Sequence, residues 1–142
     1  MNVPAAGRAT GMAICLHRER AIPARLVRRL YDDAGWWPRR GEEDIAAILD
    51  AGPAVGAWDQ DRLVGFARSV SDGTCRAFVE DVVVARAYQR SGLGGRLLSR
   101  LLAELAGIET VSLFCDPVLA AFYERVGFSC TGQLVMHRRG DR

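Results

Sequence analysis

The sequence predicts an α+β fold built on a mixed, mostly antiparallel sheet, and three patterns indicate it. Apolar runs at 54–58 and 63–70 flank the short polar turn 59–62, which is typical of an antiparallel hairpin. A third run, 78–84, precedes a stretch with the three-and-four apolar spacing of an amphipathic helix. That helix leads to a β-rich run at 110–115. Because a helix crossover joins these last two strands, we expect them to lie parallel.

The elements before the hairpin follow from local signals taken in chain order. Residues 1–10 are small and polar, and we expect them to form a loose N-terminal end. The apolar run 12–16 suits an edge strand. Pro23 then opens a helical pattern, since proline is well tolerated in the first turn of a helix. Acidic residues at 42–44 favour the start of a second helix, and 52–53 (Gly-Pro) ends it.

The elements after the central strand complete the expected order β-α-α-β-β-β-α-β-α-β. The amphipathic helix begins near Gly94, and Gly107 is placed to end it. We expect a further helix at 118–126 and a last strand at 128–137. A chain of 142 residues has the size of one domain, so residues 1–142 are expected to share a single core.

Composition argues against several classes of protein. The net charge is +2, and the basic residues are all arginine without a clustered basic face, which does not favour nucleic-acid binding. No apolar run reaches the length of a membrane span. Four cysteines lack a C-x-x-C pair, and the first thirty residues lack a long apolar signal region. We therefore expect a reduced, metal-free, cytoplasmic protein without nucleic-acid or membrane partners.

The segment between the third strand and the long helix is rich in glycine and predicts an anion site. Glycines allow a sharp turn there and leave backbone N–H groups uncovered at a helix start. The dinucleotide fingerprint fails because Leu97 stands where its third glycine belongs, and the P-loop fails because the chain has no lysine. The N–H groups in question belong to Arg90, Ser91, Gly92, Leu93, Gly94 and Gly95.

Two motifs in this region resemble those of the GNAT N-acetyltransferase superfamily. Gln89, Arg90, Gly92 and Gly94 fit its Gln/Arg-x-x-Gly-x-Gly/Ala signature, after a strand that carries Glu-Asp-Val-Val-Val. Downstream, residues 121–128 (Ala-Phe-Tyr-Glu-Arg-Val-Gly-Phe) are similar to the family's F-Y-x-x-x-G-F segment. The resemblance implies a three-layer fold in which the two parallel strands splay apart.

The resemblance also implies acetyl-CoA as the co-substrate and no metal. In the family, the pantetheine arm enters the splay like an added strand, through β-augmentation. Its amides would bond the backbone of Val82, Val83 and Val84, and the pyrophosphate would rest on the N–H groups of 90–95. Taken by composition alone, Val82 to Val84 could equally be plain core.

Transfer of an acetyl group to an amine needs a base and an acid. A primary amine with a pKa of roughly 10.4 is almost all ammonium at neutral pH, and the CoA thiolate leaves more easily when protonated. The resemblance assigns the acid to Tyr123 and the base to Glu80, directly or through water. Tyr123 could instead pack on the core, and either Glu80 or its neighbour Asp81 could simply pair with an arginine. A bulge would change which of the two acids faces the cleft.

The acceptor side is expected to involve Trp36, Trp37, Asp81 and Asp116. In the superfamily the loop after the first helix caps the acceptor cleft, so one tryptophan is expected as a wall for substrate and the other as a hinge packed on the core. Asp116 stands where many members carry an Asn that contacts the cofactor. An ionised carboxylate cannot donate that bond, which favours contact with a cationic amine. Asp116 with Pro117 is also a routine helix start.

Residues 30–36 and 63–73 resemble the serotonin-type branch of arylalkylamine acetyltransferases, which suggests a small, aromatic primary amine. The sequence thus predicts an acetyl-CoA-dependent N-acetyltransferase that uses direct attack in a ternary complex. Two alternatives stay open, an acetyltransferase of protein or peptide amino groups and a non-catalytic acyl-CoA-binding regulatory module. Exposed edge strands at the chain ends favour a homodimer.

Overall fold

A five-stranded sheet in chain order forms the centre of the computed structural model, which describes residues 11–142. The first four strands are antiparallel neighbours, and the fifth lies parallel to the fourth. The predicted mixed, mostly antiparallel sheet is therefore confirmed. The loose end expected at 1–10 lies outside the described residues. The strands are β1 (Met12–Leu16), β2 (Ala54–Asp59), β3 (Arg62–Ser71), β4 (Arg76–Val84) and β5 (Thr110–Leu113).

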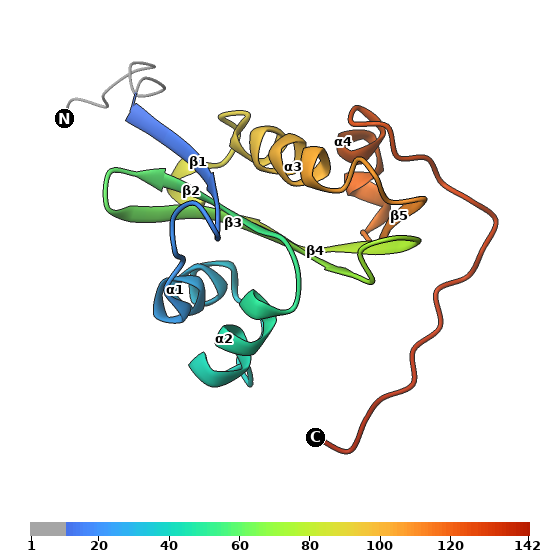
Figure 1. The fold of residues 1–142 in the computed structure, drawn as a ribbon, viewed down its shortest axis with the longest axis horizontal. Helices are drawn as coiled ribbons and strands as arrows, with labels where there is room; N and C mark the ends of the chain where they lie inside the picture. Colours follow the sequence, from blue (N-terminus) through green and yellow to red (C-terminus); the bar gives the residue numbers. More distant parts are fainter. Residues whose placement is uncertain (1–10) are drawn as a thin grey trace.

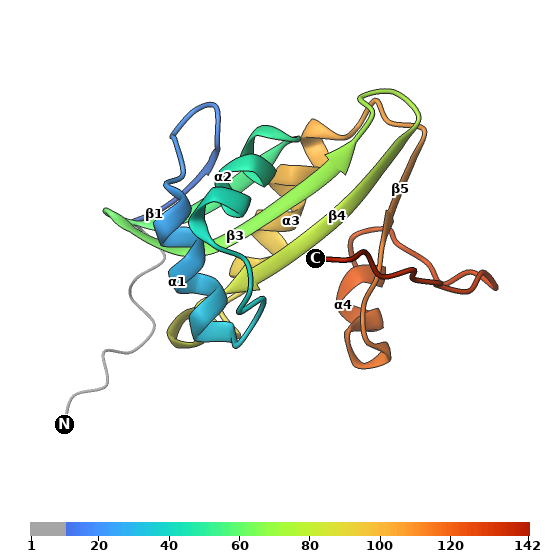
Figure 2. The same ribbon diagram turned by 90° about the horizontal axis from the view of Figure 1, so that it is seen from below.

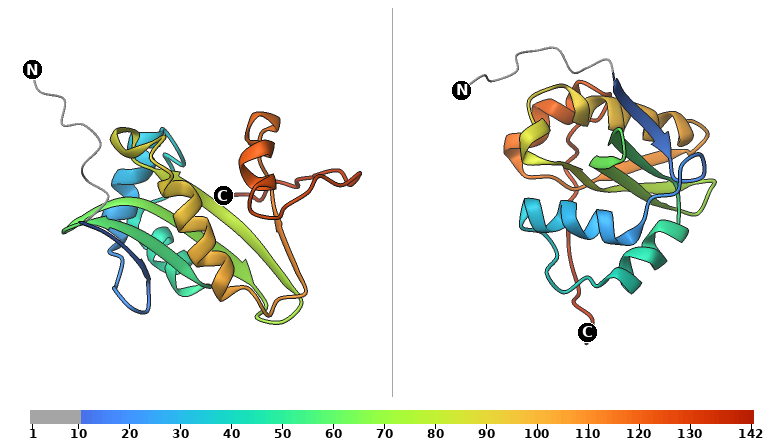
Figure 3. Two further views of the ribbon diagram at one scale, coloured as in Figure 1. Left: turned by 90° about the horizontal axis from the view of Figure 1, so that it is seen from above. Right: turned by 90° about the vertical axis from the view of Figure 1, so that its left-hand side faces the viewer.

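The helices cover both faces of this sheet and make a three-layer arrangement (Figure 1). α1 and α2 lie on one face and α3 on the other, as the end-on view of Figure 3 also shows. The helices are α1 (Ala24–Ala34), α2 (Glu42–Asp50), α3 (Leu93–Glu104) and α4 (Ala120–Glu124), with 3-10 turns at Arg86–Tyr88 and Pro117–Leu119.

Adjacent residues of β3 face the two helical layers in turn, as strand geometry requires. Phe66 packs edge-on against Tyr31 of α1, with ring centroids 6.4 Å apart. Its neighbour Gly65 faces α3, where an added Cβ would lie 2.7 Å from a methyl group of Leu97. Phe66, Tyr31 and Leu97 are fully buried, so β3 is fixed from both sides. The neighbouring strand β4 therefore pairs with a strand that is packed on both faces.

A β-bulge interrupts the pairing of β3 with β4. Phe66 pairs with Val83 and Arg68 with Glu80, so β4 carries one more residue than β3 between these pairs. Within the bulge Asp81 has a φ of 55°, a conformation uncommon for residues other than glycine. Its side chain is buried, whereas Glu80 before it is only half-buried. The bulge thus separates the environments of two adjacent acids.

The parallel strands β4 and β5 pair over a short stretch and then diverge. Their ladder ends at Val79 and Leu113, while β4 continues to Val84. Figure 2 shows the two strands meeting at one end of the sheet and separating toward α4. From Glu80 onward, the β5-facing edge of β4 has no neighbouring strand among residues 11–142. The predicted splay is present.

The strand expected at 128–137 is wrong. Residues 128–142 contain no helix or strand, and Leu134 and Met136 are each 87% exposed. A strand requires a neighbour to pair with, and β5 ends after Leu113. The helix expected at 118–126 is instead the 3-10 turn followed by the short α4, and α3 ends at Glu104, before Gly107.

Candidate active site

A cavity of about 780 Å³ lies where β4 and β5 diverge. Its lining comes from the loop after α1, from β4, from the segment after β5 and from α4. These parts are distant in sequence, and the splay of the two strands brings them together. Six residues predicted for catalysis or substrate binding line it, namely Trp36, Trp37, Glu80, Asp81, Asp116 and Tyr123.

A second hollow of about 300 Å³ extends the cavity along β4 toward the glycine-rich turn. Val82 and Trp36 line both hollows, and Val83, Val84 and Gln89 line only the second. The Gln89 side chain donates a hydrogen bond to the Val84 carbonyl at 3.1 Å. Together the two hollows form a path from Glu80 to the glycine-rich turn, along the edge of β4 that β5 does not pair with.

The glycine-rich turn leads into α3 through two residues with left-handed backbone. Arg90 has a φ of 59° and Gly92, the N-cap residue, a φ of 81°. No side chain caps α3, so the first-turn N–H groups of Leu93, Gly94 and Gly95 lack the usual side-chain acceptor. This arrangement suits a phosphate. The Leu93 side chain itself is buried, so it offers only its backbone to an anion.

The Ser91 hydroxyl is already engaged within the turn, where it donates a hydrogen bond to the Tyr88 carbonyl at 2.5 Å. It stabilises the turn and leaves the main chain to face an anion. Gly94 lies close to α4, because an added Cβ there would contact the Phe122 ring at 3.4 Å. The turn and the F-Y segment, which the sequence identified separately, are thus in contact.

Glu80 carries a half-buried carboxylate in the lining of the cavity. Within residues 11–142 its side chain forms no ion pair or hydrogen bond, which disfavours the structural alternative of an arginine partner. Burial raises the pKa of Glu80 above its usual value, and the negative charge of Asp81 raises it further. Arg68, Arg40 and His137 act in the opposite direction. A carboxylate with a raised pKa is better suited to accept a proton near neutral pH.

Tyr123 is held by rings on either side. Its ring makes edge-on contacts with Phe122 and Phe128, at centroid distances of 4.9 and 6.1 Å. Burial raises the pKa of Tyr123, with a smaller contribution from Cys115. The phenol therefore stays protonated at neutral pH and keeps a proton to donate.

Asp81 occupies a different environment from Glu80 although the two are adjacent. The carboxylate accepts hydrogen bonds from Arg68 at 2.7 Å and from Arg40 at 3.0 Å. The Tyr31 hydroxyl and the Trp37 indole N–H donate two more, at 2.8 and 2.9 Å. These bonds connect β4 to β3, to α1 and to the loop that carries the tryptophans.

Trp36 and Trp37 both line the cavity and are 38% and 43% exposed, so neither is a buried hinge as the sequence suggested for one of them. Trp37 has a φ of 50°, which lets adjacent side chains face the same cavity. Arg28 of α1 holds the loop, because its guanidinium donates to the carbonyls of Trp36, Trp37 and Arg40 at 2.6–2.9 Å.

Asp116 is exposed at the mouth of the cavity. It precedes the 3-10 turn at Pro117, as expected for a helix start, and its carbonyl accepts the Leu119 N–H at 2.9 Å. Its carboxylate makes no capping hydrogen bond. The side chain is thus not committed to capping the turn.

The C-terminal segment also contributes to the cavity, which sequence patterns did not indicate. Val135 lines it, and the His137 ring packs edge-on against Phe114 at 6.0 Å. Further on, Arg142 pairs with Asp44 of α2 at 2.8 Å. The last residues thus run from α4 past the sheet to the side on which α2 lies (Figure 1).

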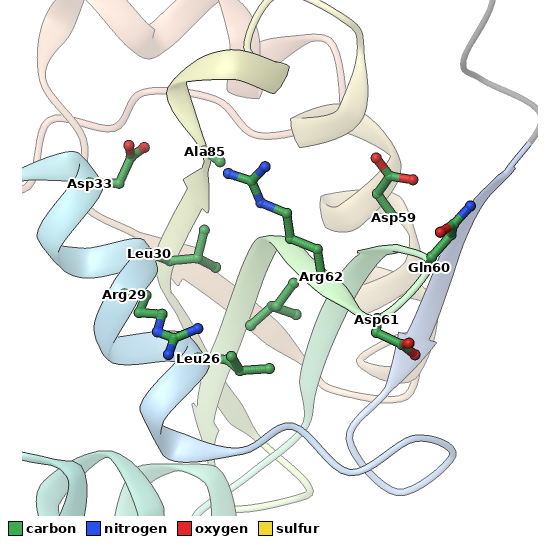
Figure 4. A pocket seen from close by; sticks show the side chains of 10 residues that line it. Leu26, Arg29, Leu30, Asp33, Asp59, Gln60, Asp61, Arg62 and Ala85 are labelled. Atoms are coloured by element: carbon green, nitrogen blue, oxygen red, sulfur yellow. The ribbon is translucent and has the colours of Figure 1, made fainter.

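A separate hollow of about 620 Å³ lies between α1 and the turn joining β2 to β3 (Figure 4). Leu26, Leu30 and Leu63 contribute its apolar lining, and the arginines Arg29 and Arg62 are exposed. No residue predicted for the site lines it, so it stands apart from the cleft between β4 and β5.

Residues 11–142 contain neither a candidate metal centre nor a candidate membrane span. No cluster of three or more His, Cys, Asp or Glu side chains is arranged to hold a metal ion in that range. Over the same residues, every helix falls short of the length and apolar character needed to cross a bilayer.

Comparison with known proteins extends these observations. The chain is 39% identical over 100 residues to a ycf52-like N-acetyltransferase of Prochlorococcus marinus, covering 66% of this chain and 56% of that protein. It is 36% identical over 102 residues to serotonin N-acetyltransferase 2, chloroplastic, of Oryza sativa subsp. japonica, covering 66% and 50%. The chain thus spans about half the length of these relatives.

Solved structures and a family model agree with these relatives. A GNAT family acetyltransferase from Streptococcus pneumoniae superposes with a TM-score of 0.73 and 28% identity, over 90% of this chain and 99% of that one. The model of the acetyltransferase (GNAT) family matches residues 19–128, which include β4, the glycine-rich turn and Tyr123. The chain therefore belongs to the GNAT acetyltransferase family.

Proposed function

We propose that the protein transfers the acetyl group of acetyl-CoA to the primary amine of a small molecule. The observation that carries this is the free edge of β4 beyond Val79, which leads from the uncapped start of α3 to a cavity holding both Glu80 and Tyr123. Backbone groups of 82–84 bond the pantetheine amides, and the N–H groups of 90–95 receive the pyrophosphate.

The reaction is a direct attack in a ternary complex. Glu80 takes a proton from the ammonium, directly or through a water molecule, and the freed nitrogen lone pair attacks the thioester carbonyl. The C–S bond then breaks, and the departing thiolate takes the phenolic proton of Tyr123. The acylated nitrogen still carries one proton more than the amide product, and this proton passes to the Tyr123 phenolate, directly or through water. Solvent removes the other proton from Glu80, so both groups are restored for the next cycle.

The tryptophans of the loop after α1 favour a small acceptor. Trp36 and Trp37 present aromatic surface to the cavity, and an aromatic amine packs well on such surface. Asp116 at the mouth adds a carboxylate for the ammonium. The similarity to the rice serotonin N-acetyltransferase supports the same class. A panel of arylalkylamines, aliphatic amines and amino-terminal peptides would rank small molecules against protein substrates.

Substitution of Tyr123 by phenylalanine separates an enzyme from a binding module. Release of CoA thiol with the best amine of the panel is expected to fall about a hundredfold to ten-thousandfold, since general-acid assistance is lost. The dissociation constant for acetyl-CoA, measured by calorimetry, should stay within about threefold, because the phenol is not needed for binding. If no amine gives turnover with the wild-type protein while acetyl-CoA still binds, the chain is an acyl-CoA-binding module.

A further inference from the structure

The Asp81 carboxylate is closed off from the cavity that its residue borders. Its side chain is 2% exposed, and four donors approach its two oxygens. Oδ2 accepts from Tyr31, Arg40 and Arg68, and Oδ1 accepts from Trp37. Each carboxylate oxygen has about two lone-pair sites, so Oδ2 is saturated while Oδ1 keeps one. Burial of the side chain, at 2% exposure, keeps a substrate ammonium away from that remaining site.

These partners connect β4 to three other parts of the fold at one point. Tyr31 belongs to α1 and Arg68 to β3, while Trp37 and Arg40 belong to the loop between α1 and α2, called the acceptor loop below. The Arg40 guanidinium also stacks over the Trp37 ring at 4.0 Å, so both loop contacts with Asp81 support one orientation of the indole. The wall of the acceptor cavity is thus fastened to the strand that carries Glu80.

The backbone on both sides of this junction is in an uncommon conformation. Asp81 has a φ of 55° and Trp37 a φ of 50°, values that residues other than glycine seldom adopt. Such conformations persist where surrounding contacts determine them, and the bond between these two side chains is one such contact. Loss of the carboxylate would free the loop to relax.

We propose that Asp81 is a positioning residue, whose buried carboxylate fixes the indole of Trp37 as the acceptor wall and keeps the β4 bulge that directs Glu80 into the cavity. This inference rests on the proposed acetyl transfer. It assigns Asp81 neither the base role nor direct contact with the amine. Its effect on the reaction passes through Trp37 and Glu80.

Kinetics of Asp81→Asn provide the main test, because asparagine keeps the size of the side chain but loses the charge. The KM for the amine is expected to rise about tenfold or more, while the KM for acetyl-CoA stays within about threefold, since the cofactor path lies along 82–95. Equal increases in both KM values would overturn the proposal.

The pH profile adds a readout that a purely structural role would not change. The charged groups around Glu80 are Asp81 on β4, Arg68 on β3, Arg40 in the acceptor loop and His137 in the C-terminal segment. In Asp81→Asn the negative charge beside Glu80 is lost, so the pKa of Glu80 should fall, and the positive charges that remain act in the same direction. The acidic limb of kcat/KM should therefore move to lower pH. Complete loss of that limb would identify Asp81 as the base and contradict the proposal.

A milder variant covers the case in which Asp81→Asn does not fold. Tyr31→Phe removes one donor to Asp81 and keeps the buried ring. It should raise the amine KM about twofold to fivefold without moving the acidic limb, because no charge changes. Asp61→Asn is the matched control for Asp81→Asn, since Asp61 is a fully exposed aspartate whose arginine partner lies 3.6 Å away. An unchanged amine KM in Tyr31→Phe would count against the proposal.

Fluorescence tests the same positioning without turnover. Asp81→Asn should shift tryptophan emission in the wild-type background, and the shift should disappear in a Trp37→Phe background, because Trp37 is the tryptophan bonded to Asp81. If no amine is ever acetylated but this pattern is found, the proposed function fails and the positioning of Trp37 stands. A shift that persists in the Trp37→Phe background would refute the positioning itself.

Discussion

Glu80 and Asp81 are identical in charge and adjacent in sequence, yet their surroundings divide the work between them. Asp81 has four hydrogen-bond donors, two of them arginines, which connect its carboxylate to the surrounding scaffold. Glu80 is half-buried and has no hydrogen-bond or ion-pair partner within residues 11–142, and burial raises its pKa. A group in that condition is costly in the folded state and reactive toward protons, which is typical of functional acids.

Glu80→Gln is therefore expected to stabilise the fold and remove the activity. Because the folded-state pKa of Glu80 lies above its unfolded value, the folded protein loses stability as pH rises through that window and carries the loss at neutral pH. Glutamine carries no charge for burial to penalise, so the melting temperature at pH 7 should rise. The kcat should drop about a hundredfold or more. A variant with a lowered melting temperature or near-normal kcat would contradict the role of Glu80.

At the residue scale, local motifs indicate the candidate base and acid, whereas no local pattern indicates the partners of Asp81. Glu80 and Tyr123 follow from motifs and do line one cavity. Asp81 was expected to contact substrate, and its four partners lie 13, 41, 44 and 50 residues away along the chain. No spacing rule links residues at such distances. The left-handed backbone of Asp81 and Trp37 is likewise set by tertiary contacts.

At the scale of elements, the start of α3 is the feature most directly tied to cofactor binding. The first three residues of α3 are Leu93, Gly94 and Gly95. The helix has no side-chain cap and no acidic residue in its first turn. Helices usually gain stability from such groups. Their absence leaves the positive end of the helix dipole free for an external anion. In the proposed function, this helix start gives up that stability in order to bind the pyrophosphate.

Gly95→Asp tests this exchange. No neighbouring atom lies within 4 Å of an added Cβ at Gly95, so the change introduces no clash. An acidic residue in the first turn should stabilise the helix by about 0.3–1 kcal/mol, while its charge repels the pyrophosphate. We expect a higher melting temperature together with an acetyl-CoA dissociation constant raised about tenfold or more.

Ser99→Asp is the matched control, since Ser99 is an exposed residue further along the same helix. It adds the same charge away from the first turn, where the dipole effect has faded. If Ser99→Asp weakens acetyl-CoA binding as much as Gly95→Asp does, net charge rather than the helix start is responsible.

At the scale of the whole molecule, the splay of β4 from β5 forms the cavity that the predicted catalytic and substrate-binding residues line. Hydrophobic periodicity was sufficient to predict five strands, three of the helices and the parallel crossover, because each has a strong local pattern. A last strand is expected at 128–137, but the apolar side chains at 134–136 are exposed. Strand formation depends on a partner, and that partner is not encoded in the segment itself.

Hydrogen exchange with and without acetyl-CoA tests the central claim, that the open edge of β4 and the uncapped turn together bind the cofactor. Peptides covering 80–84 and 90–95 should exchange more slowly when acetyl-CoA is present, because its amides and phosphates take up free backbone groups there. Peptides from the separate hollow around Leu26 and Arg62 should be unaffected. Protection confined to that hollow, or binding without any slowing at 80–84 and 90–95, would contradict the claim.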